Sequence, residues 1–297
     1  MRSARFGLIG NHYSTSLCLI KRAAEDRGIR AIFCSPLAFP RYALSTIAQE
    51  GIELDHIKLL DFDCFYIDIL DHRNGFFRGY FGKDIWISLQ QRYQDFAKEE
   101  MENKSYQLLL LLLLSDLRPC VNHPKRLLLT RLRPTTLFNL RRNGIPVVDF
   151  RITSNGSSQV EERAGAGLAR IRIEEERCYD VPCFPRTLRG CLSVETTTPE
   201  QTWEVVSVIG YEGKSIIERG DSARIRRPKP DDIREICQDV LSTLGLDVAS
   251  IKFAREKGDL KVFDVNPFPD IATFEEATGE PISEAIVDRM IERSGIK

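Results

Sequence analysis

The residues best suited to chemistry lie near the C-terminus, within residues 250–270. Asp264 and Asn266 are two positions apart, so in a β-strand their side chains point to the same face. Carboxylate and amide oxygens are ligands that a hard divalent cation such as Mg²⁺ accepts. The pair could therefore hold a cation. The alternative is a plain hairpin in which Asp264 is a solvated surface residue and Asn266 and Pro267 turn the chain.

The same segment has the pattern of a β-hairpin. Residues 251–254 and 260–265 are strand-like, and Lys257, Gly258 and Asp259 supply the turn between them. Helices are predicted on either side, over 231–244 with Gly245 as its end and over 282–293 with apolar residues on one face. Further strands are predicted at 169–173, 192–195, 205–209 and 215–218.

The N-terminal part alternates strands and helices. A strand over 6–9, a helix over 16–27 and a strand over 29–34 make a β-α-β unit, whose simplest arrangement is a parallel sheet. A strand within 64–70 and helices over 83–98 and 135–143 extend the alternation. We predict an N-terminal α/β domain over 1–120, a central nucleotide-binding subdomain over 121–185 and a C-terminal subdomain over 186–297. The glycine pattern of dinucleotide-binding folds is absent.

The overall composition narrows the function classes. The 297 residues include 42 basic and 43 acidic side chains, so charge gives no reason to expect nucleic acid or a membrane surface as a partner. Seven leucines at 108–114 are too few to span a bilayer and predict a buried helix or strand. No signal peptide is recognisable. The eight cysteines form no CxxC pair, which argues against zinc and favours reduced thiols in a cytoplasmic protein.

Three segments together resemble the ATP-grasp superfamily, most nearly the RimK-type carboxylate–amine ligases and the related peptide-macrocyclising ligases. The first is VNHP at 121–124 with Arg133, Pro134 and residues 140–146; the second is the hinge-like stretch 182–190. The third and strongest comprises 244–247, 251–253 and 264–267, followed by 278–282. The resemblance runs from about residue 121 to the end. It implies an α/β chain with an ATP-grasp fold, preceded by a small parallel α/β domain.

The resemblance also implies an activity and its cofactors, ATP and Mg²⁺. A peptide or small-molecule carboxylate would attack the γ-phosphoryl group, and an amine would displace phosphate from the acylphosphate. Asp264 and Asn266 would hold the metal. The nucleotide would contact Arg133, Arg172 and three hinge residues, Pro185, Arg186 and Leu188. The resemblance leaves room for a homodimer.

The basic residues after 218 have two interpretations. Arg219, Arg224 and Arg226 could bind the anionic substrate carboxylate or the acylphosphate, which would make Arg224 and Arg226 catalytic together with Lys252. The alternative is a solvated surface strand.

Several positions depart from the family pattern. Lys252 stands where the family has its first metal-binding Asp, and a protonated ammonium cannot coordinate a metal. Asp264 replaces the usual Glu. Arg133 replaces the first nucleotide Lys with altered geometry. At the hinge, Arg186 stands where Glu is expected, and Glu204 falls roughly where the family has a substrate-side Arg.

Two nucleotide features are also unmatched. No second nucleotide Lys is found between 151 and 180, where Arg170 or Arg172 could substitute. The glycines at 165 and 167 could form a phosphate lid, although a simple turn is the common role of such residues.

The departures leave two hypotheses. One is a divergent ligase with an atypical metal site, in which Lys252 provides a fixed positive charge in place of one metal. The other is a pseudoenzyme, a catalytically inactive ATP-grasp relative that binds a peptide or partner. Asp264 and Asn266 favour the first, and the charge reversals favour the second.

Overall fold

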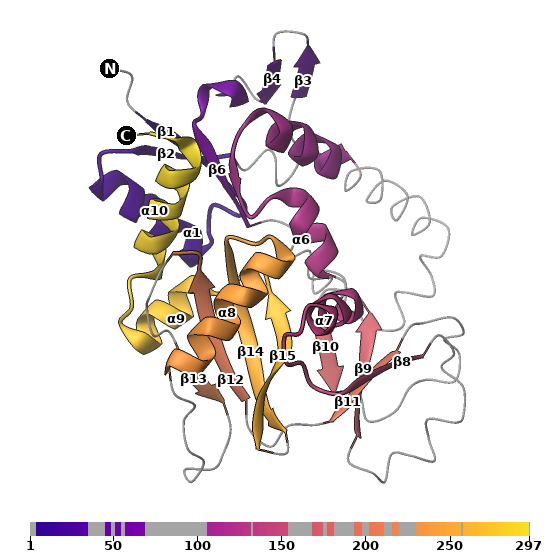
Figure 1. Cartoon of the computed structure of the whole chain (residues 1–297). Helices are drawn as coiled ribbons and strands as arrows, with labels where there is room; N and C mark the ends of the chain where they lie inside the picture. The colour runs from indigo at the N-terminus through magenta and orange to yellow at the C-terminus, as the bar shows by residue number, and fades with distance from the viewer. Residues whose placement is uncertain are drawn as a thin grey trace, which may run out of the picture.

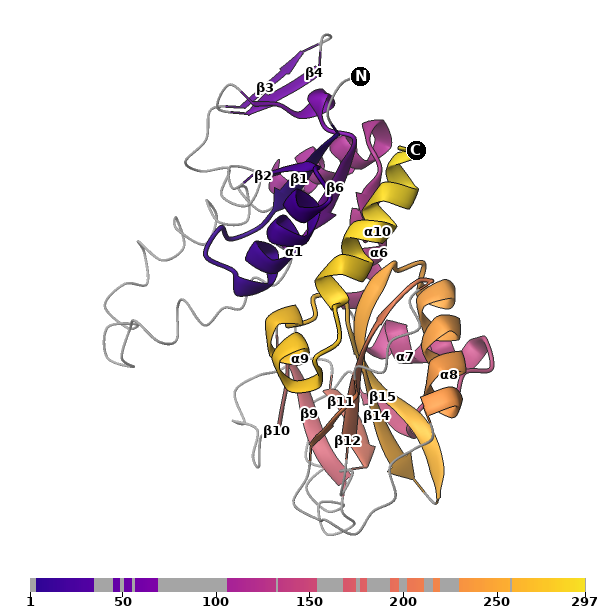
Figure 2. The same ribbon diagram turned by 90° about the vertical axis from the view of Figure 1, so that its left-hand side faces the viewer.

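The computed structural model describes residues 4–34, 45–48, 51–54, 57–68, 106–131, 133–153, 168–174, 177–180, 193–197, 202–210, 216–219, 230–256 and 258–296. The described strands form three four-stranded sheets and one small three-stranded sheet, arranged along the molecule with helices between and beside them (Figures 1 and 2).

The N-terminal sheet is parallel, as its β-α-β pattern predicts. Its strands are ordered β2 (Arg30–Phe33), β1 (Arg5–Ile9), β6 (Cys64–Ile67) and β7 (Cys120–Val121). Helix α1 (Thr15–Asp26) connects β1 to β2, and the Ser14 side chain caps it by accepting from the Leu17 amide at 3.4 Å. A small antiparallel sheet of β3 (Ser45–Ala48), β4 (Gly51–Leu54) and β5 (Ile57–Lys58) precedes the short helix η2 (Leu59–Asp61).

The leucine-rich run is a helix. Residues 106–117 are helical, and Leu110, Leu111 and Leu114 are fully buried. Within the described ranges, no helix combines the length and apolar character needed to cross a membrane. One side of this helix therefore belongs to the protein core.

The central part contains α6 (Pro124–Arg131), α7 (Arg133–Arg142) and a four-stranded antiparallel sheet. The strand order is β10 (Arg177–Asp180), β9 (Leu168–Glu174), β11 (Ser193–Thr197) and β8 (Phe150–Thr153). Helix α7 confirms the helix predicted over 135–143, and the strands β9 and β11 confirm those predicted at 169–173 and 192–195.

The C-terminal sheet contains the predicted hairpin. Its antiparallel strands are ordered β13 (Ile216–Arg219), β12 (Thr202–Val208), β14 (Val248–Glu256) and β15 (Asp259–Asn266). Residues 146–148 extend the β15 edge, since the Val262 amide donates to the Pro146 carbonyl at 2.8 Å and the Val148 amide donates to the Val262 carbonyl at 3.0 Å. Helix α8 (Pro230–Leu244) packs on β12 and β14, and α9 (Ile271–Thr278) and α10 (Ile282–Ser294) complete the chain.

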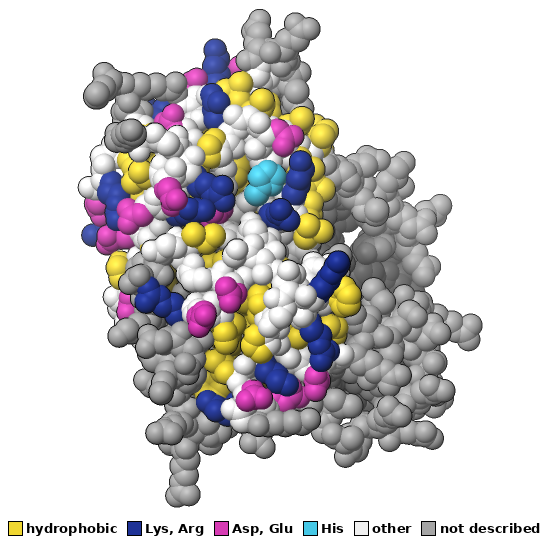
Figure 3. All heavy atoms as spheres, in the orientation of Figure 1, with side chains coloured by type: hydrophobic (Ala, Val, Ile, Leu, Met, Phe, Trp, Pro, Cys, Tyr) yellow, Lys and Arg dark blue, Asp and Glu magenta, His cyan; other side chains and the backbone are white. Residues whose placement is uncertain are grey.

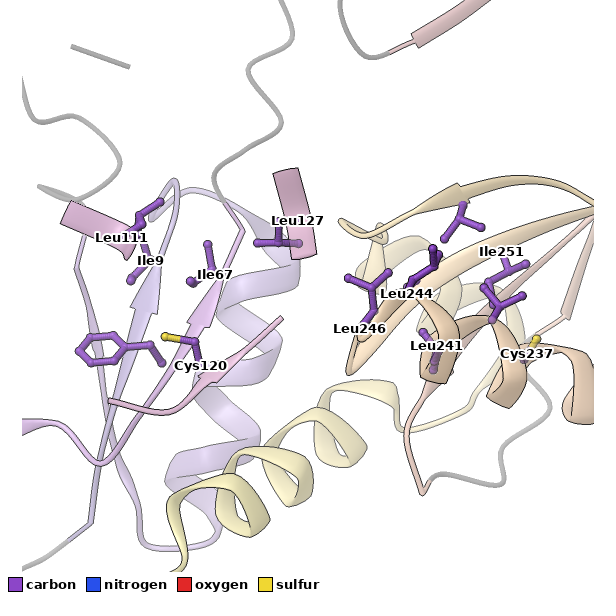
Figure 4. Close-up of a cluster of buried hydrophobic side chains, with 14 of the residues drawn as sticks. Ile9, Ile67, Leu111, Cys120, Leu127, Cys237, Leu241, Leu244, Leu246 and Ile251 are labelled. Atoms are coloured by element: carbon purple, nitrogen blue, oxygen red, sulfur yellow. The ribbon is translucent and has the colours of Figure 1, made fainter. Parts of the chain in front are cut away.

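Alternating residues divide the C-terminal sheet into two faces. One face carries buried apolar residues, including Trp203, Ile251 and Phe253, in the same core as α8. Figure 4 shows Leu241 and Leu244 of this helix beside Leu246 and Ile251, with Ile9, Ile67 and Cys120 of the N-terminal sheet in a second group.

The opposite face of that sheet joins the N-terminal domain. Val206, Val208 and Val248 share one buried cluster with residues of β1, α1, α9 and α10. Helix α10 contacts α1, β6, β7 and β12, so it lies between the two parts of the chain (Figure 2). The predicted helix at 83–98 lies outside the described residues, and the predicted domain boundaries stay predictions.

Candidate functional site

Polar side chains form a row across the C-terminal sheet. Glu204 of β12 pairs directly with Lys252 of β14, and Lys252 pairs directly with Asp264 of β15. Directly opposite residues of an antiparallel pair point to the same face. This row, named here the charged row, therefore presents a carboxylate, an ammonium and a carboxylate in sequence. It lies on the face away from α8.

A second polar pair lies beside the charged row. Ser250 of β14 is opposite Asn266 of β15, and both share the face of Lys252 and Asp264 because side chains alternate along a strand. The Ser250 hydroxyl donates to the Glu204 carboxylate at 3.0 Å. The predicted juxtaposition of Asp264 and Asn266 on one face agrees with this register.

Arg133 reaches the charged row from the start of α7. Its Nε lies 3.5 Å from Asp264 Oδ1, its Nη2 donates to the Phe263 carbonyl at 2.7 Å, and its guanidinium lies 4.5 Å from the centre of the Phe263 ring. The register shifts between Lys252 and Phe253, so Phe263 falls outside the regular pairing. The bulge thus directs a carbonyl and a carboxylate to one buried arginine. Arg133 was predicted at the nucleotide, and its described contacts are with the hairpin.

The Asn266 side chain is fixed by a local turn. Its Oδ1 accepts from the Phe268 amide at 3.1 Å, and its Nδ2 donates to the Phe268 carbonyl at 2.9 Å. A carbonyl-type oxygen has two lone pairs, so Oδ1 keeps one for another ligand. The turn orients the amide before any ligand binds.

The oxygen donors could fit one Mg²⁺. This ion is commonly held by one or two carboxylates and completes its shell with phosphate oxygens and water. Asp264 and Asn266 could supply the protein share. They do not fit a pair of metal ions, because Lys252 is a cation in the same row. Among the described residues, no group of three or more His, Cys, Asp or Glu side chains could hold a metal.

A buried hydrogen-bonded centre supports this hairpin. The Asn122 side chain accepts from the amides of Asp247 and Val248 at 2.8 and 3.0 Å. Its Nδ2 donates to the carbonyls of Val248 and Pro267 at 2.7 and 3.0 Å. Asn122 therefore joins the end of β7, the start of β14 and the end of β15. Its φ of 53° is a left-handed conformation that Asn tolerates better than most residues.

Two arginines of α10 hold the same centre. Asp247 is fully buried, and its Oδ1 accepts from Arg289 at 2.7 Å and from Arg293 at 2.8 Å. Its Oδ2 accepts from the backbone amide of Asn122 at 3.2 Å. Sequence reasoning placed Asn122 and Asp247 in separate motifs and gave neither a role. An apolar stretch interrupted by a single Asp, as in 244–251, was the available signal for a buried charge.

The other predicted site residues are not brought to the row by the described structure. Pro185, Arg186, Leu188, Arg224 and Arg226 lie outside the described residues, and Arg172 lies in β9 without a described side chain. On the face drawn in Figure 3, acidic and basic side chains are interspersed over the described residues.

Comparisons with known proteins identify the fold. No family model matches the chain, and no curated protein matches it. Several solved structures match it in fold. The ATP-grasp ligase PsnB, complexed with minimal precursor, Mg and ADP, has a TM-score of 0.71 and 14% identity over 99% of this chain and 99% of that chain.

Two further structures agree. The macrocyclase MdnB from Microcystis aeruginosa MRC has a TM-score of 0.70 and 15% identity, over 98% of this chain and 99% of that chain. A RimK domain protein ATP-grasp from Sphaerobacter thermophilus DSM 20745 has a TM-score of 0.57 and 15% identity, over 97% of this chain and 100% of that chain. These likenesses extend through the N-terminal domain, the hairpin and the closing helices, and the chain therefore has the ATP-grasp fold.

Proposed function

We propose that the chain is an ATP-dependent carboxylate–amine ligase that acts on a peptide through an acylphosphate. The observation that carries the proposal is the pairing of Asp264 and Asn266 on one face of β15, within a fold shared along its length with ligases. PsnB is complexed with a precursor, Mg and ADP, and MdnB is a macrocyclase. A peptide substrate, ATP and Mg²⁺ are the corresponding expectations for this chain.

The proposed reaction has two steps. A substrate carboxylate oxygen attacks the γ-phosphorus of ATP, and the bond to the ADP oxygen breaks. An amine nitrogen then attacks the acyl carbon, inorganic phosphate leaves and the amine loses a proton. Mg²⁺, when bound, would offset phosphate charge.

The chain's own residues would prepare the phosphate site. Arg133 orients Asp264, and the Phe268 turn orients Asn266. Both side chains would be held before the nucleotide arrives, which lowers the ordering cost of binding.

Hydroxylamine trapping tests the chemistry without knowledge of the amine. The chain is incubated with ATP, Mg²⁺ and a library of peptides rich in Asp and Glu, and hydroxamates are detected by mass spectrometry. We expect a gain of about 15 Da on one peptide carboxyl, coupled to ADP formation. The Asp264→Asn variant should lose most of this signal, and the exposed Asp149→Asn variant should keep it.

A second candidate function is peptide or partner binding without catalysis. The observation that favours it is that Arg133 already pairs with Asp264, while Lys252 lies directly opposite. Two positively charged side chains beside this carboxylate would weaken its attraction for a metal ion. Peptide binding by calorimetry, with neither hydroxamate nor ADP formed at millimolar ATP and Mg²⁺, would favour this function and exclude the ligase.

A further inference from the structure

Lys252 has an unusual position in the sheet. It is half-buried at the middle of the charged row, with a carboxylate directly opposite on each neighbouring strand. Among the residues that the structure describes, no hydrogen bond or ion pair engages its ammonium. A lysine between two carboxylates would ordinarily pair with one of them.

Both neighbouring carboxylates have other partners. Glu204 is 6% exposed and accepts from the Ser250 hydroxyl, and Asp264 pairs with Arg133. Each carboxylate is therefore drawn toward its own donor. The two carboxylates still favour a positive charge between them. The Lys252 ammonium thus lies between two carboxylates, while its three N–H donors form no hydrogen bond with the described residues of the sheet.

We propose that the Lys252 ammonium binds a phosphate group of the nucleotide directly, and thereby takes the place of a divalent cation in the site. The proposal rests on the nucleotide site of the proposed function. An ammonium is a compact point charge that suits phosphate oxygens. It is adjacent to Asp264 and Asn266, where phosphates would meet the hairpin. Nucleotide binding would then have a component that needs no metal.

Calorimetry with ADP tests this in the presence of EDTA, so that no divalent ion contributes. The intact chain should bind metal-free ADP, and Lys252→Met should weaken that binding by about tenfold or more, the range of a charge-assisted hydrogen bond. Lys261→Met is the matched control. It removes a lysine from the same hairpin, but Lys261 pairs with Glu256 at 2.7 Å. The control should bind ADP as the parent does.

Lys252→Asp provides a sharper contrast. The new carboxylate would repel metal-free ADP, so its affinity should fall further than in Lys252→Met. Added Mg²⁺ should then improve ADP binding by a larger factor than in the parent, because the site gains an oxygen ligand. If Lys252→Met does not fold, as judged by its thermal transition, Lys252→Gln takes its place.

The outcomes separate this inference from the proposed function. Equal metal-free ADP affinity in the parent and in Lys252→Met or Lys252→Gln overturns the role of Lys252, even if hydroxamates form. A Lys252-dependent affinity without hydroxamates supports the inference and excludes the ligase. A parent chain that binds no ADP, with or without Mg²⁺, overturns both.

Discussion

Asn122 and Asp247 bind each other reciprocally although 125 positions separate them. The backbone amide of Asp247 donates to Asn122 Oδ1 at 2.8 Å, and the backbone amide of Asn122 donates to Asp247 Oδ2 at 3.2 Å. This pair ties β7, the last strand of the N-terminal sheet, to the start of β14. Because β14 carries Lys252, the pair fixes the charged row relative to the N-terminal sheet.

Replacing Asn122 should destabilise the whole chain. Asn122→Ala removes four side-chain hydrogen bonds in a fully buried position and forces Ala into a left-handed conformation. We expect a loss of about 3–5 kcal/mol, since buried groups lose their partners. Urea unfolding followed by circular dichroism measures it.

Asn122→Gly separates the two causes. Glycine accepts a φ of 53° without strain but lacks the carboxamide side chain. It should recover about 1 kcal/mol relative to Asn122→Ala, the usual cost of a left-handed non-glycine residue. Asn143→Ala, at an exposed helix end, is the control and should change stability by less than about 1 kcal/mol. Equal stability of Asn122→Ala and the parent would contradict the interpretation.

Arg133 should serve the hairpin bulge as well as the charge of Asp264. Arg133→Met leaves the partly buried Phe263 carbonyl without this donor and Asp264 without this cation. We expect a loss of about 2–3 kcal/mol. Arg133→Lys keeps the charge, but a single ammonium does not reproduce the planar fork, so it should recover only part of the stability.

The measurement is urea unfolding of both variants beside Arg141→Lys, an exposed arginine of α7 that pairs with Asp149. The control should match the parent within about 0.5 kcal/mol. An Arg133→Lys variant as stable as the parent would show that charge alone suffices there.

Short-range patterns predicted most described elements. The hairpin, α1, α8 and α10 follow from apolar spacing and glycine ends, and the parallel order of β1 and β2 follows from the helix between them. The shared face of Asp264 and Asn266 needs only the two-residue period of a strand. These features depend on residues that are neighbours in the sequence.

Long-range pairings escaped prediction. Nothing in the spacing of Glu204 and Lys252 shows that β12 lies beside β14, because 39 residues, which include β13 and α8, separate the two strands. The contact of Arg133 with the bulge at Phe263 also joins distant parts of the sequence, because α7 packs on β15. Helix α9 was missed because eight residues give little periodic signal.

His123 should make stability depend on pH. Its burial, followed by the nearby Lys125, lowers the pKa of the imidazole from 6.5. Its Nδ1 accepts from the Lys125 amide at 3.2 Å, which requires that nitrogen to be unprotonated. As pH falls below about 6.5, the unfolded chain binds a proton before the folded chain does, so stability should decline there until the lower folded pKa is passed.

Urea midpoints measured from pH 7.5 to 5 check the sign. His123→Gln should show a smaller decline than the parent, because glutamine does not titrate. His12→Gln, at an exposed position, is the matched control and should retain the parental decline. A parental curve that rises as the pH falls through this range, and that His123→Gln flattens, would contradict the direction.

The described cysteines should fall into two classes of reactivity, buried thiols that react slowly and an exposed thiol that reacts fast. Burial raises the pKa of Cys34, Cys64 and Cys237 to about 12, and it raises that of Cys120 further. At pH 8 almost none of these four thiols would be ionised, and thiolate is the reactive form.

Cys18 is the exposed cysteine among the described ones, so iodoacetamide should modify it while the four buried thiols stay unmodified. Peptide mapping by mass spectrometry identifies the modified positions, and urea should expose the other four. Cys18→Ser should remove the fast modification within 4–34 without changing the thermal transition. Rapid modification of Cys64 or Cys120 in the folded chain would mean that the N-terminal sheet opens readily. The centre of Asn122 and Asp247 would then fail to hold that sheet to the hairpin.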